Sequence, residues 1–361
     1  MRPLYRLEEL GIELLWFDSL GAKCSSIAIT TSRGLIVIDP GAAEMQPSYP
    51  LPAYEKQRLR IKALSRIENY VSRANIVIVT HYHYDHHVLP SDPMLSNKRL
   101  FQGKILYLKN PNTYINESQW KRARLFISEL DSLASDSINK YITEPKLSEC
   151  RDPVEKLTLA LSKDFGDYSR RRAELLEKGR KWFHNLCDLW SREPWIEEHE
   201  LGDGTKILWA EGRTLDLGDT EIVLLEPWFH GIEYDRTGWI VPIIVKKRSR
   251  EMFFTSDVMG PAIEDYAEYI ARSRSEVVIL DGPPTYLFPY MLNRINLQRA
   301  IDNAITIVCS RPRLVIYDHH LLREKRWRQR VADVFREAEK CGSVVMTAAE
   351  YLGKVPLIDV L

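Results

Sequence analysis

Four of the nine histidines of the chain lie in one short segment, which sets tighter limits on fold and function than any other feature. It follows the apolar run Ile76–Val79, which predicts a buried strand, and it presents the pattern H-x-H-x-D-H at His81, His83, Asp85 and His86. Imidazole and carboxylate groups are ligands of zinc, manganese and iron in proteins. Four such side chains within six residues cannot all reach one tetrahedral ion without strain. The spacing therefore favours two adjacent metal ions that share these ligands.

Three further predicted strands also end near a histidine or an aspartate. These strands and the residues that follow them are 221–225 with His230, 252–255 with Asp257, and 314–317 with His319 and His320. Strand ends in an open α/β sheet gather along one edge, which is where binding sites form. The sequence therefore predicts one site built from four strand ends.

The composition is that of an ordinary globular protein, since 45% of the 361 residues are hydrophobic and 50 basic side chains balance 50 acidic ones. Zero net charge argues against a general nucleic-acid-binding protein, although a substrate groove could be locally basic. No run reaches the roughly 18 to 20 apolar residues of a membrane helix, and the N-terminal segment lacks the features of a secretory signal. These observations predict a cytoplasmic protein without a membrane partner.

The five cysteines are far apart in the sequence and form no C-x-x-C pair. This spacing argues against a disulfide framework and against a cysteine zinc site. We therefore expect separate, buried thiols, which suit a reducing cytoplasm.

Three stretches of the chain have different patterns. The first and third are rich in strands that alternate with helical spacing, including predicted helices over 52–73, 292–305 and 322–340 and a predicted strand over 239–245. The middle stretch, about 111–200, is charged and helical in period, with aromatic stripes that indicate packing. We expect a single domain over 1–361, with this middle stretch as a helix-rich insertion.

In these motifs the chain resembles the metallo-β-lactamase superfamily, whose members are four-layer αββα sandwiches. The matching residues run in the family's order: Asp39, His81, His83, Asp85, His86, His230, Asp257 and His319. The segment Asp18–Ser26 also looks like the family's first loop. Among relatives, the chain looks most like uncharacterised archaeal predicted hydrolases of this superfamily. The resemblance implies an α/β (α+β) sandwich with a helical insertion, but it implies no substrate.

The resemblance also implies two divalent metal ions, with Zn²⁺ expected and Mn²⁺ or Fe²⁺ as alternatives. One ion would be held by His81, His83 and His230, the other by Asp85, His86 and His319, and both by a bridging Asp257. Asp39 would support the site by hydrogen bonding without being a ligand.

The last ligand is either His319 or His320. His319 is favoured because it stands relative to its strand as His81 does, directly after a polar strand-end residue. Around His230 the chain departs from the family's Gly-His-Thr pattern, and it lacks the glycine that commonly follows the H-x-H-x-D-H motif. No ligand role is expected for the remaining histidines, His87, His184 and His199.

This ligand set predicts a hydrolase in which a bridging hydroxide attacks an ester, thioester, lactone or phosphodiester bond. Asp85 would orient this nucleophile and carry its proton, and the candidate catalytic residues are Asp85, Asp39 and His320. One alternative is a di-iron oxidoreductase, whose relatives carry an acid at the position of His83, and another is a metal-binding protein without turnover. We expect a small-molecule or anionic substrate, since no nucleic-acid-binding motif is present.

Basic side chains are concentrated in three segments, at 56–73, 170–181 and 323–330. Solvated helix faces are the simpler interpretation, and steering of an anionic substrate toward the metals is the alternative. The insertion at about 111–200 is interpreted as a lid that sets specificity.

Overall fold

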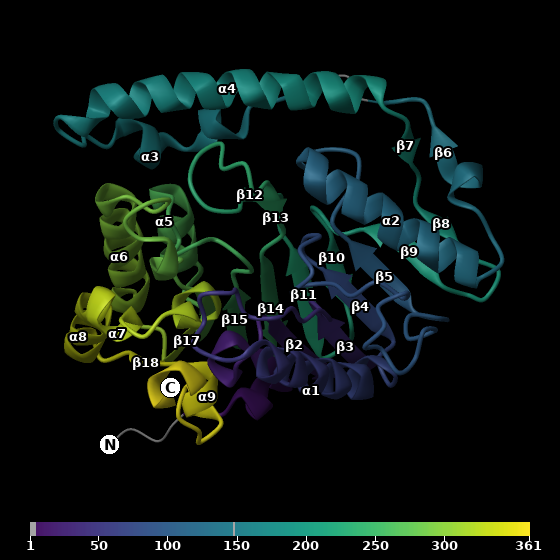
Figure 1. Cartoon of the computed structure of the whole chain (residues 1–361), viewed down its shortest axis with the longest axis horizontal. Helices are drawn as coiled ribbons and strands as arrows, with labels where there is room; N and C mark the ends of the chain where they lie inside the picture. Colours follow the sequence, from purple (N-terminus) through teal and green to yellow (C-terminus); the bar gives the residue numbers. More distant parts are fainter. Residues whose placement is uncertain (1–4, 147–148) are drawn as a thin grey trace.

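Two seven-stranded sheets face each other in the computed structural model, which describes residues 5–146 and 149–361 (Figure 1). The strands of the first sheet are, in spatial order, β1 (Ile12–Phe17), β2 (Ser25–Thr31), β3 (Gly34–Ile38), β4 (Ile76–Val79), β5 (Ile105–Leu108), β9 (Lys206–Trp209) and β8 (His199–Glu200). Those of the second are β10 (Thr214–Asp216), β11 (Thr220–Leu224), β14 (Ile243–Lys247), β15 (Arg250–Phe254), β16 (Val277–Asp281), β17 (Leu314–Asp318) and β18 (Val344–Met346).

Strand β4 is buried on both faces, which explains its uninterrupted apolar sequence. Ile76 and Ile78 lie in the layer between the sheets, whereas Val77 and Val79 pack in the cluster that includes the outer helix α1 (Ala53–Val71). Successive side chains of a strand point to opposite faces, and β4 pairs in parallel with β3 and β5. The His-rich segment therefore begins where an inner strand ends.

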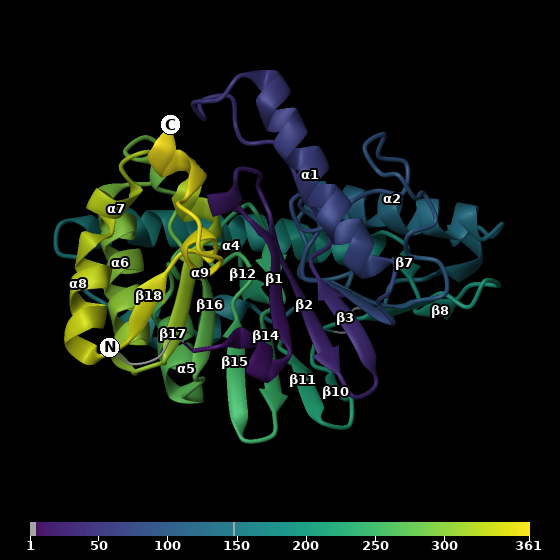
Figure 2. The same cartoon turned by 90° about the horizontal axis from the view of Figure 1, so that it is seen from below.

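Helices cover the outer face of each sheet. The first sheet is covered by α1, and the second by α5 (Glu264–Ser273), α6 (Arg294–Cys309) and α8 (Ala332–Cys341), with the short α7 (Trp327–Arg330) and α9 (Ala348–Tyr351) nearby (Figures 1 and 2). Ala63, Leu64 and Ile67 form the buried side of α1, as the helical spacing predicts. The predicted four-layer αββα sandwich is thereby confirmed.

The helix-rich insertion lies between β5 and β9. It contains α2 (Glu117–Leu133), α3 (Thr158–Ser162) and α4 (Tyr168–Arg192), with the two-residue strands β6 (Ile142–Thr143) and β7 (Trp195–Ile196) paired to each other. In Figure 1, α4 crosses the top of the molecule. Its buried Phe183 and Trp190 pack against Trp239 of β13 (Trp239–Ile240), so the aromatic stripe of α4 is a packing surface.

Two elements predicted as continuous are interrupted. The strand predicted over 239–245 is divided into β13 and β14, because Pro242 lies between them and has no N–H to donate to a ladder. The helix predicted over 322–340 is divided into a 3-10 turn at His319–Arg323, then α7 and α8. Between α7 and α8, Val331 has a φ of −113°, outside the helical region.

The expectation of separate thiols is wrong for four of the five cysteines. Cys150 is bonded to Cys187 and Cys309 to Cys341, and only Cys24 is a free, buried thiol. The bonded cysteines lie 37 and 32 residues apart in sequence, and sequence spacing does not show that the fold places their Cα atoms 5.9 and 5.2 Å apart. Among the described residues, none of the helices has the length and apolar character needed to cross a membrane.

Candidate metal centre

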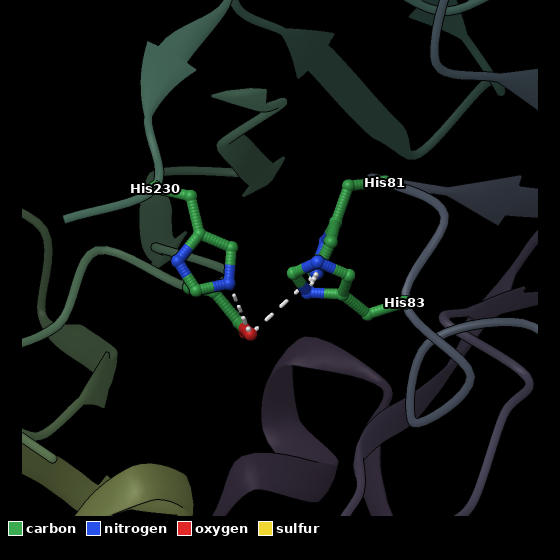
Figure 3. Close-up of side chains that lie close together, drawn as sticks. His81, His83 and His230 are labelled. Carbon is green, nitrogen blue, oxygen red and sulfur yellow. Dashed lines mark hydrogen bonds and ion pairs between the residues drawn. The ribbon is translucent and has the colours of Figure 1, made fainter. Parts of the chain in front are cut away.

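All of the predicted site residues meet where strands of both sheets end. Asp39 follows β3; His81, His83, Asp85 and His86 follow β4; His230 follows β12 (Trp228–Phe229); Asp257 follows β15; His319 and His320 follow β17. They are buried apart from His83, which is partly exposed. Figure 3 shows the rings of His81, His83 and His230 lying together, contributed by segments far apart in the sequence.

The first group of ligand atoms consists of His81, His83, His230 and Asp257, with one donor atom of each within 4.8 Å of the others. His81 Nε2 lies 3.1 Å from His83 Nδ1 and 3.6 Å from Asp257 Oδ2. His230 Nε2 lies 3.1 Å from the same carboxylate oxygen. Three imidazoles and a carboxylate at this spacing can surround one ion.

The second group consists of Asp85, His86 and His319, again within 4.8 Å of one another. His86 Nε2 lies 3.3 Å from His319 Nε2, and His319 Nε2 lies 3.9 Å from Asp85 Oδ2. Asp257 contacts this group too, with Oδ1 3.1 Å from His86 Nε2 and Oδ2 3.2 Å from His319 Nε2. Asp257 therefore stands between the two groups.

Three buried atoms at the site have no hydrogen-bond partner among the described residues: His230 Nδ1, His230 Nε2 and Asp257 Oδ1. The two close contacts of His230 Nε2 and Asp257 Oδ1, both 3.1 Å, lack hydrogen-bond geometry. Because buried polar atoms are normally paired, such atoms call for a different kind of partner. The donor set, rich in imidazole and with a shared carboxylate, fits a divalent metal ion.

Carboxylates outside the two groups orient three of the histidines. Nδ1 of each ring donates to a buried aspartate: His86 to Asp39 at 2.8 Å, His319 to Asp18 at 2.8 Å and His320 to Asp281 at 2.9 Å. This contact leaves Nε2 of each ring on the side of Asp257. Carboxylates in this position fix ring orientation and raise the basicity of a ligand.

Of these carboxylates, only Asp39 is predicted by the sequence as a supporting residue. Asp281 ends β16, so the strand-end argument applied to the run 277–280 would have found it. Asp18 lies in the segment that resembles the family's first loop, but no pattern within that loop indicates a contact with His319, 301 residues away. His320 lies 3.9 Å from Asp257 and forms a further group with Asp257 and His319, so both members of the His319–His320 pair reach the centre.

Arg323 links the second group to the supporting carboxylate Asp18. Its Nε donates to Asp18 at 2.6 Å and its Nη2 to Asp85 at 3.3 Å, and only 5% of the residue is exposed. The interpretation of 323–330 as a solvated helix face is therefore wrong for Arg323, because the chain leaves the helical path there and turns inward. The other histidines behave as expected for packing or solvated residues. His87 packs among aromatic rings, His199 stacks on Tyr141, and His184 is exposed.

The charge states of the two groups differ when no metal is bound. Burial holds the pKa of His81 and of His83 well below the ordinary value, so both rings are neutral lone-pair donors. Burial also lowers the pKa of His86, but Asp257 and Asp39 outweigh it and raise that pKa to about 10. Against burial, Asp257 and Asp18 likewise raise the pKa of His319 well above its ordinary value. The second group therefore carries protons that a bound ion displaces.

Metal binding at pH 8 is expected to release about two protons from His86 and His319, besides the proton lost by a water that the ions activate. The folded pKa of His86 is about 10 against an ordinary value of 6.5. In the metal-free protein, protonated His86 stabilises the fold fully below pH 6.5, and this stabilisation is lost as the pH rises through 10. Because the proton on His86 is held less firmly as the pH rises, a metal ion displaces it more easily across this range. Calorimetric titration with zinc in buffers of different ionisation enthalpy measures the release. Proton-neutral binding at pH 8 would contradict this assignment, and His86→Ala should release about one proton fewer.

A close backbone approach holds the His-rich segment against the loop after β3. A Cβ atom on Gly41 would lie 2.3 Å from the amide nitrogen of His87 and 2.6 Å from the carbonyl carbon of His86. Both atoms belong to the backbone, which cannot move away without shifting the ring of His86.

Gly41→Ala is therefore expected to lower the free energy of unfolding by about 1–3 kcal/mol and to weaken metal binding at the second group. Urea denaturation and metal analysis of the purified variant measure the two effects. Gly202→Ala is the matched control, because a Cβ on Gly202 has no neighbouring atom within 4 Å among the described residues. Equal stability and metal content in the two variants would show that the close approach is unimportant.

The chain is similar over almost its whole length to archaeal proteins named UPF0282. It is 28% identical to the protein of Korarchaeum cryptofilum over 93% of this chain and 87% of that protein. It is 27% identical to the protein of Methanopyrus kandleri over 94% of this chain and 93% of that protein. No family model matches the chain.

Solved structures similar to this one include proteins with a metallo-β-lactamase fold. The protein YhfI of Bacillus subtilis is 11% identical, with a TM-score of 0.40, over 93% of this chain and 95% of that one. Zn²⁺-bound PqqB of Methylobacterium extorquens is 11% identical, with a TM-score of 0.42, over 93% and 97%. The two facing sheets, the helical outer layers and the ordered His and Asp residues of this chain agree with the predicted αββα sandwich, and in sequence the chain is similar to the archaeal UPF0282 proteins.

Proposed function

We propose that the protein is a metal-dependent hydrolase with a dinuclear centre, with zinc as the expected metal. The observation that carries this proposal is the position of Asp257, which contacts imidazoles of both ligand groups. A single carboxylate between two sets of histidines suits two neighbouring ions rather than one. In this proposal the first ion is held by His81, His83, His230 and Asp257, and the second by Asp85, His86, His319 and Asp257.

Two such ions, when bound, lower the pKa of a water molecule and polarise the bond under attack. The side chains of this protein supply orientation and proton control. Arg323 holds Asp85 by a hydrogen bond, and the pKa of Asp85 lies well below its ordinary value because His86 and Arg323 outweigh the effect of burial. Asp85 is thus held as an anion that can accept a hydrogen bond from the attacking water and orient it. His320 has its Nδ1 bound by Asp281, which aims its Nε2 at the same region.

A small anionic substrate with an ester, thioester, lactone or phosphodiester bond suits this site. Lys23, in the loop after β1, is partly buried, and its ammonium forms no ion pair within the described part of the chain. Burial and the charge of Arg323 lower the pKa of Lys23, and Asp85 acts in the opposite direction. A cation without an internal partner beside the centre favours an anionic group on the substrate. We place the site in a single domain over residues 1–361.

The first test is the metal content of protein purified without added metal or chelator, measured by mass spectrometry, with hydrolysis assays on the four bond classes. About two zinc equivalents and turnover of one class would support the proposal. Two irons without hydrolysis would favour the oxidoreductase, although His83 stands where that variant carries an acid. Protein that takes up no metal on reconstitution would overturn the proposal.

A further inference from the structure

His230 differs from His86, His319 and His320 in what holds its ring. His86, His319 and His320 each have Nδ1 bound by a carboxylate, whereas both ring nitrogens of His230 lack a hydrogen-bond partner among residues 5–146 and 149–361. A ligand without such an orienting contact depends on its backbone for its position. The loop that carries His230 must therefore be fixed in another way.

The loop 231–238 closes on His230 itself. The amide of His230 donates to the carbonyl of Gly238 at 2.9 Å, and the hydroxyl of Thr237 donates to the carbonyl of His230. These bonds make the loop and the ligand one unit, so whatever displaces the loop displaces the imidazole.

The helix-rich insertion holds this loop from the outside. At the start of α2, Asn116 Nδ2 donates to the carbonyl of Arg236 at 2.7 Å, and Gln119 Nε2 donates to that of Thr237 at 2.6 Å. The hydroxyl of Tyr234 donates to the buried Asp152. On α4, a Cβ on Gly179 would lie 2.5 Å from atoms of Tyr234, so the helix and the loop are in direct contact.

A buried ion pair holds the same loop from the side of the second sheet. Arg299 of α6 donates to both oxygens of Glu233, at 3.1 and 2.7 Å, and to both oxygens of Glu264, at 2.9 and 2.7 Å. Arg172 of α4 also donates to Glu233, at 2.7 Å. Arg299 is 3% exposed and Glu233 is 7% exposed. Glu233 lies three residues after His230, so this pair fixes the loop close to the ligand.

We propose that Arg299 is a positioning residue for the ligand His230, and that the insertion braces the loop 231–238 rather than acting only as a lid. Through Glu233, Arg299 fixes the loop whose backbone aims the otherwise unsupported imidazole into the first ligand group. Arg299 does not touch that group, so its effect is confined to the position of His230. The inference rests on the proposed dinuclear centre.

The test compares Arg299→Met with Lys109→Met in stepwise cobalt(II) titrations with a competing chelator. Lys109 is 0% exposed and pairs with Glu211, and the two residues lie just after β5 and β9. Its replacement therefore also breaks a buried ion pair, but one outside the loop 231–238. We expect Arg299→Met to weaken one of the two cobalt equivalents by about 10–100-fold. Lys109→Met should change both affinities by less than about twofold while lowering the melting temperature.

Two further variants show which ligand group holds the weakened cobalt ion and keep the comparison possible if Arg299→Met does not fold. In the His83→Ala background, which lacks a ligand of the first group, Arg299→Met should leave the remaining equivalent unchanged. Arg299→Lys keeps the positive charge but loses the guanidinium that donates to Glu233 and Glu264 at once, so it should give an intermediate cobalt affinity. If Arg299→Met does not fold, Arg299→Lys carries the comparison.

Equal weakening of both equivalents, or unchanged affinities in Arg299→Met and Arg299→Lys, would overturn this inference alone. Wild-type protein that binds no cobalt would overturn the proposed function, and the inference with it. Cobalt binding by the wild-type protein thus distinguishes a wrong inference about Arg299 from a wrong proposal for the metal centre.

Discussion

Replacement of Asp257 by alanine is expected to remove both metal ions and all hydrolytic activity, lowering the metal content from about two equivalents per chain to near zero. Asp257 is the one carboxylate of the described residues placed within 3.2 Å of imidazoles in both ligand groups. Without it, the first group keeps three imidazole rings and no carboxylate. The second group keeps one carboxylate, which already pairs with Arg323.

Mass spectrometry of the purified variant measures this loss directly, and circular dichroism checks that the chain is folded. Asp39→Ala is the informative comparison, because Asp39 contacts Thr80 and the Nδ1 atom of His86 but is not itself a member of either ligand group. It should keep much of its metal and lose activity. Asp216→Ala, at an exposed strand end, should match the wild type. Full metal occupancy in Asp257→Ala would contradict the bridging position.

Replacement of Arg323 by methionine is expected to destabilise the metal-free protein by about 3–5 kcal/mol. Arg323 is the cation between Asp18 and Asp85, and its removal leaves two buried carboxylates with less compensation. Arg323 and His319 hold the pKa of Asp18 at about 2 against the effect of burial. The stabilisation of the fold by ionised Asp18 is present above pH 3.8 and is lost as the pH falls through 2. At pH 7 the wild-type protein therefore has this stabilisation in full.

Urea denaturation at pH 7 with and without zinc measures the effect. Zinc should reduce the deficit of Arg323→Met, because a bound cation compensates the charge of Asp85. Arg328→Met is the control: Arg328 pairs with Glu350, but 43% of its side chain is exposed, and its loss should change stability by less than about 1 kcal/mol. If Arg323→Met and Arg328→Met had equal stabilities, the buried network would be unimportant.

The ligand set could be predicted because each member follows a strand. Apolar runs such as Ile76–Val79 indicate where strands end, and the order of the motifs along the chain matches a known family. The roles of Asp18 and Arg323 were not predicted, because they depend on contacts between segments 301 and 305 residues apart. Local pattern carries no information about such pairs. Arg323 in particular belongs to a charge run that in sequence is indistinguishable from a solvated helix face.

The disulfides and the interrupted helix 322–340 have the same explanation. Cys309 and Cys341 end α6 and α8, and only the packing of these helices brings them together. The predicted helix is interrupted at Glu324, whose backbone is extended with a φ of −145°, and again at Val331. The periodicity of apolar residues does not indicate such local breaks in the backbone of a helix.

Each ligand group takes residues from both sheets. The first combines His81 and His83, which follow β4, with Asp257, which follows β15, and the second combines Asp85 and His86 with His319, which follows β17. Neither half of the chain can therefore assemble a complete group alone. The proposed centre would form only when the two halves have docked, and the free energy of metal binding would then make the unfolding of the two halves interdependent.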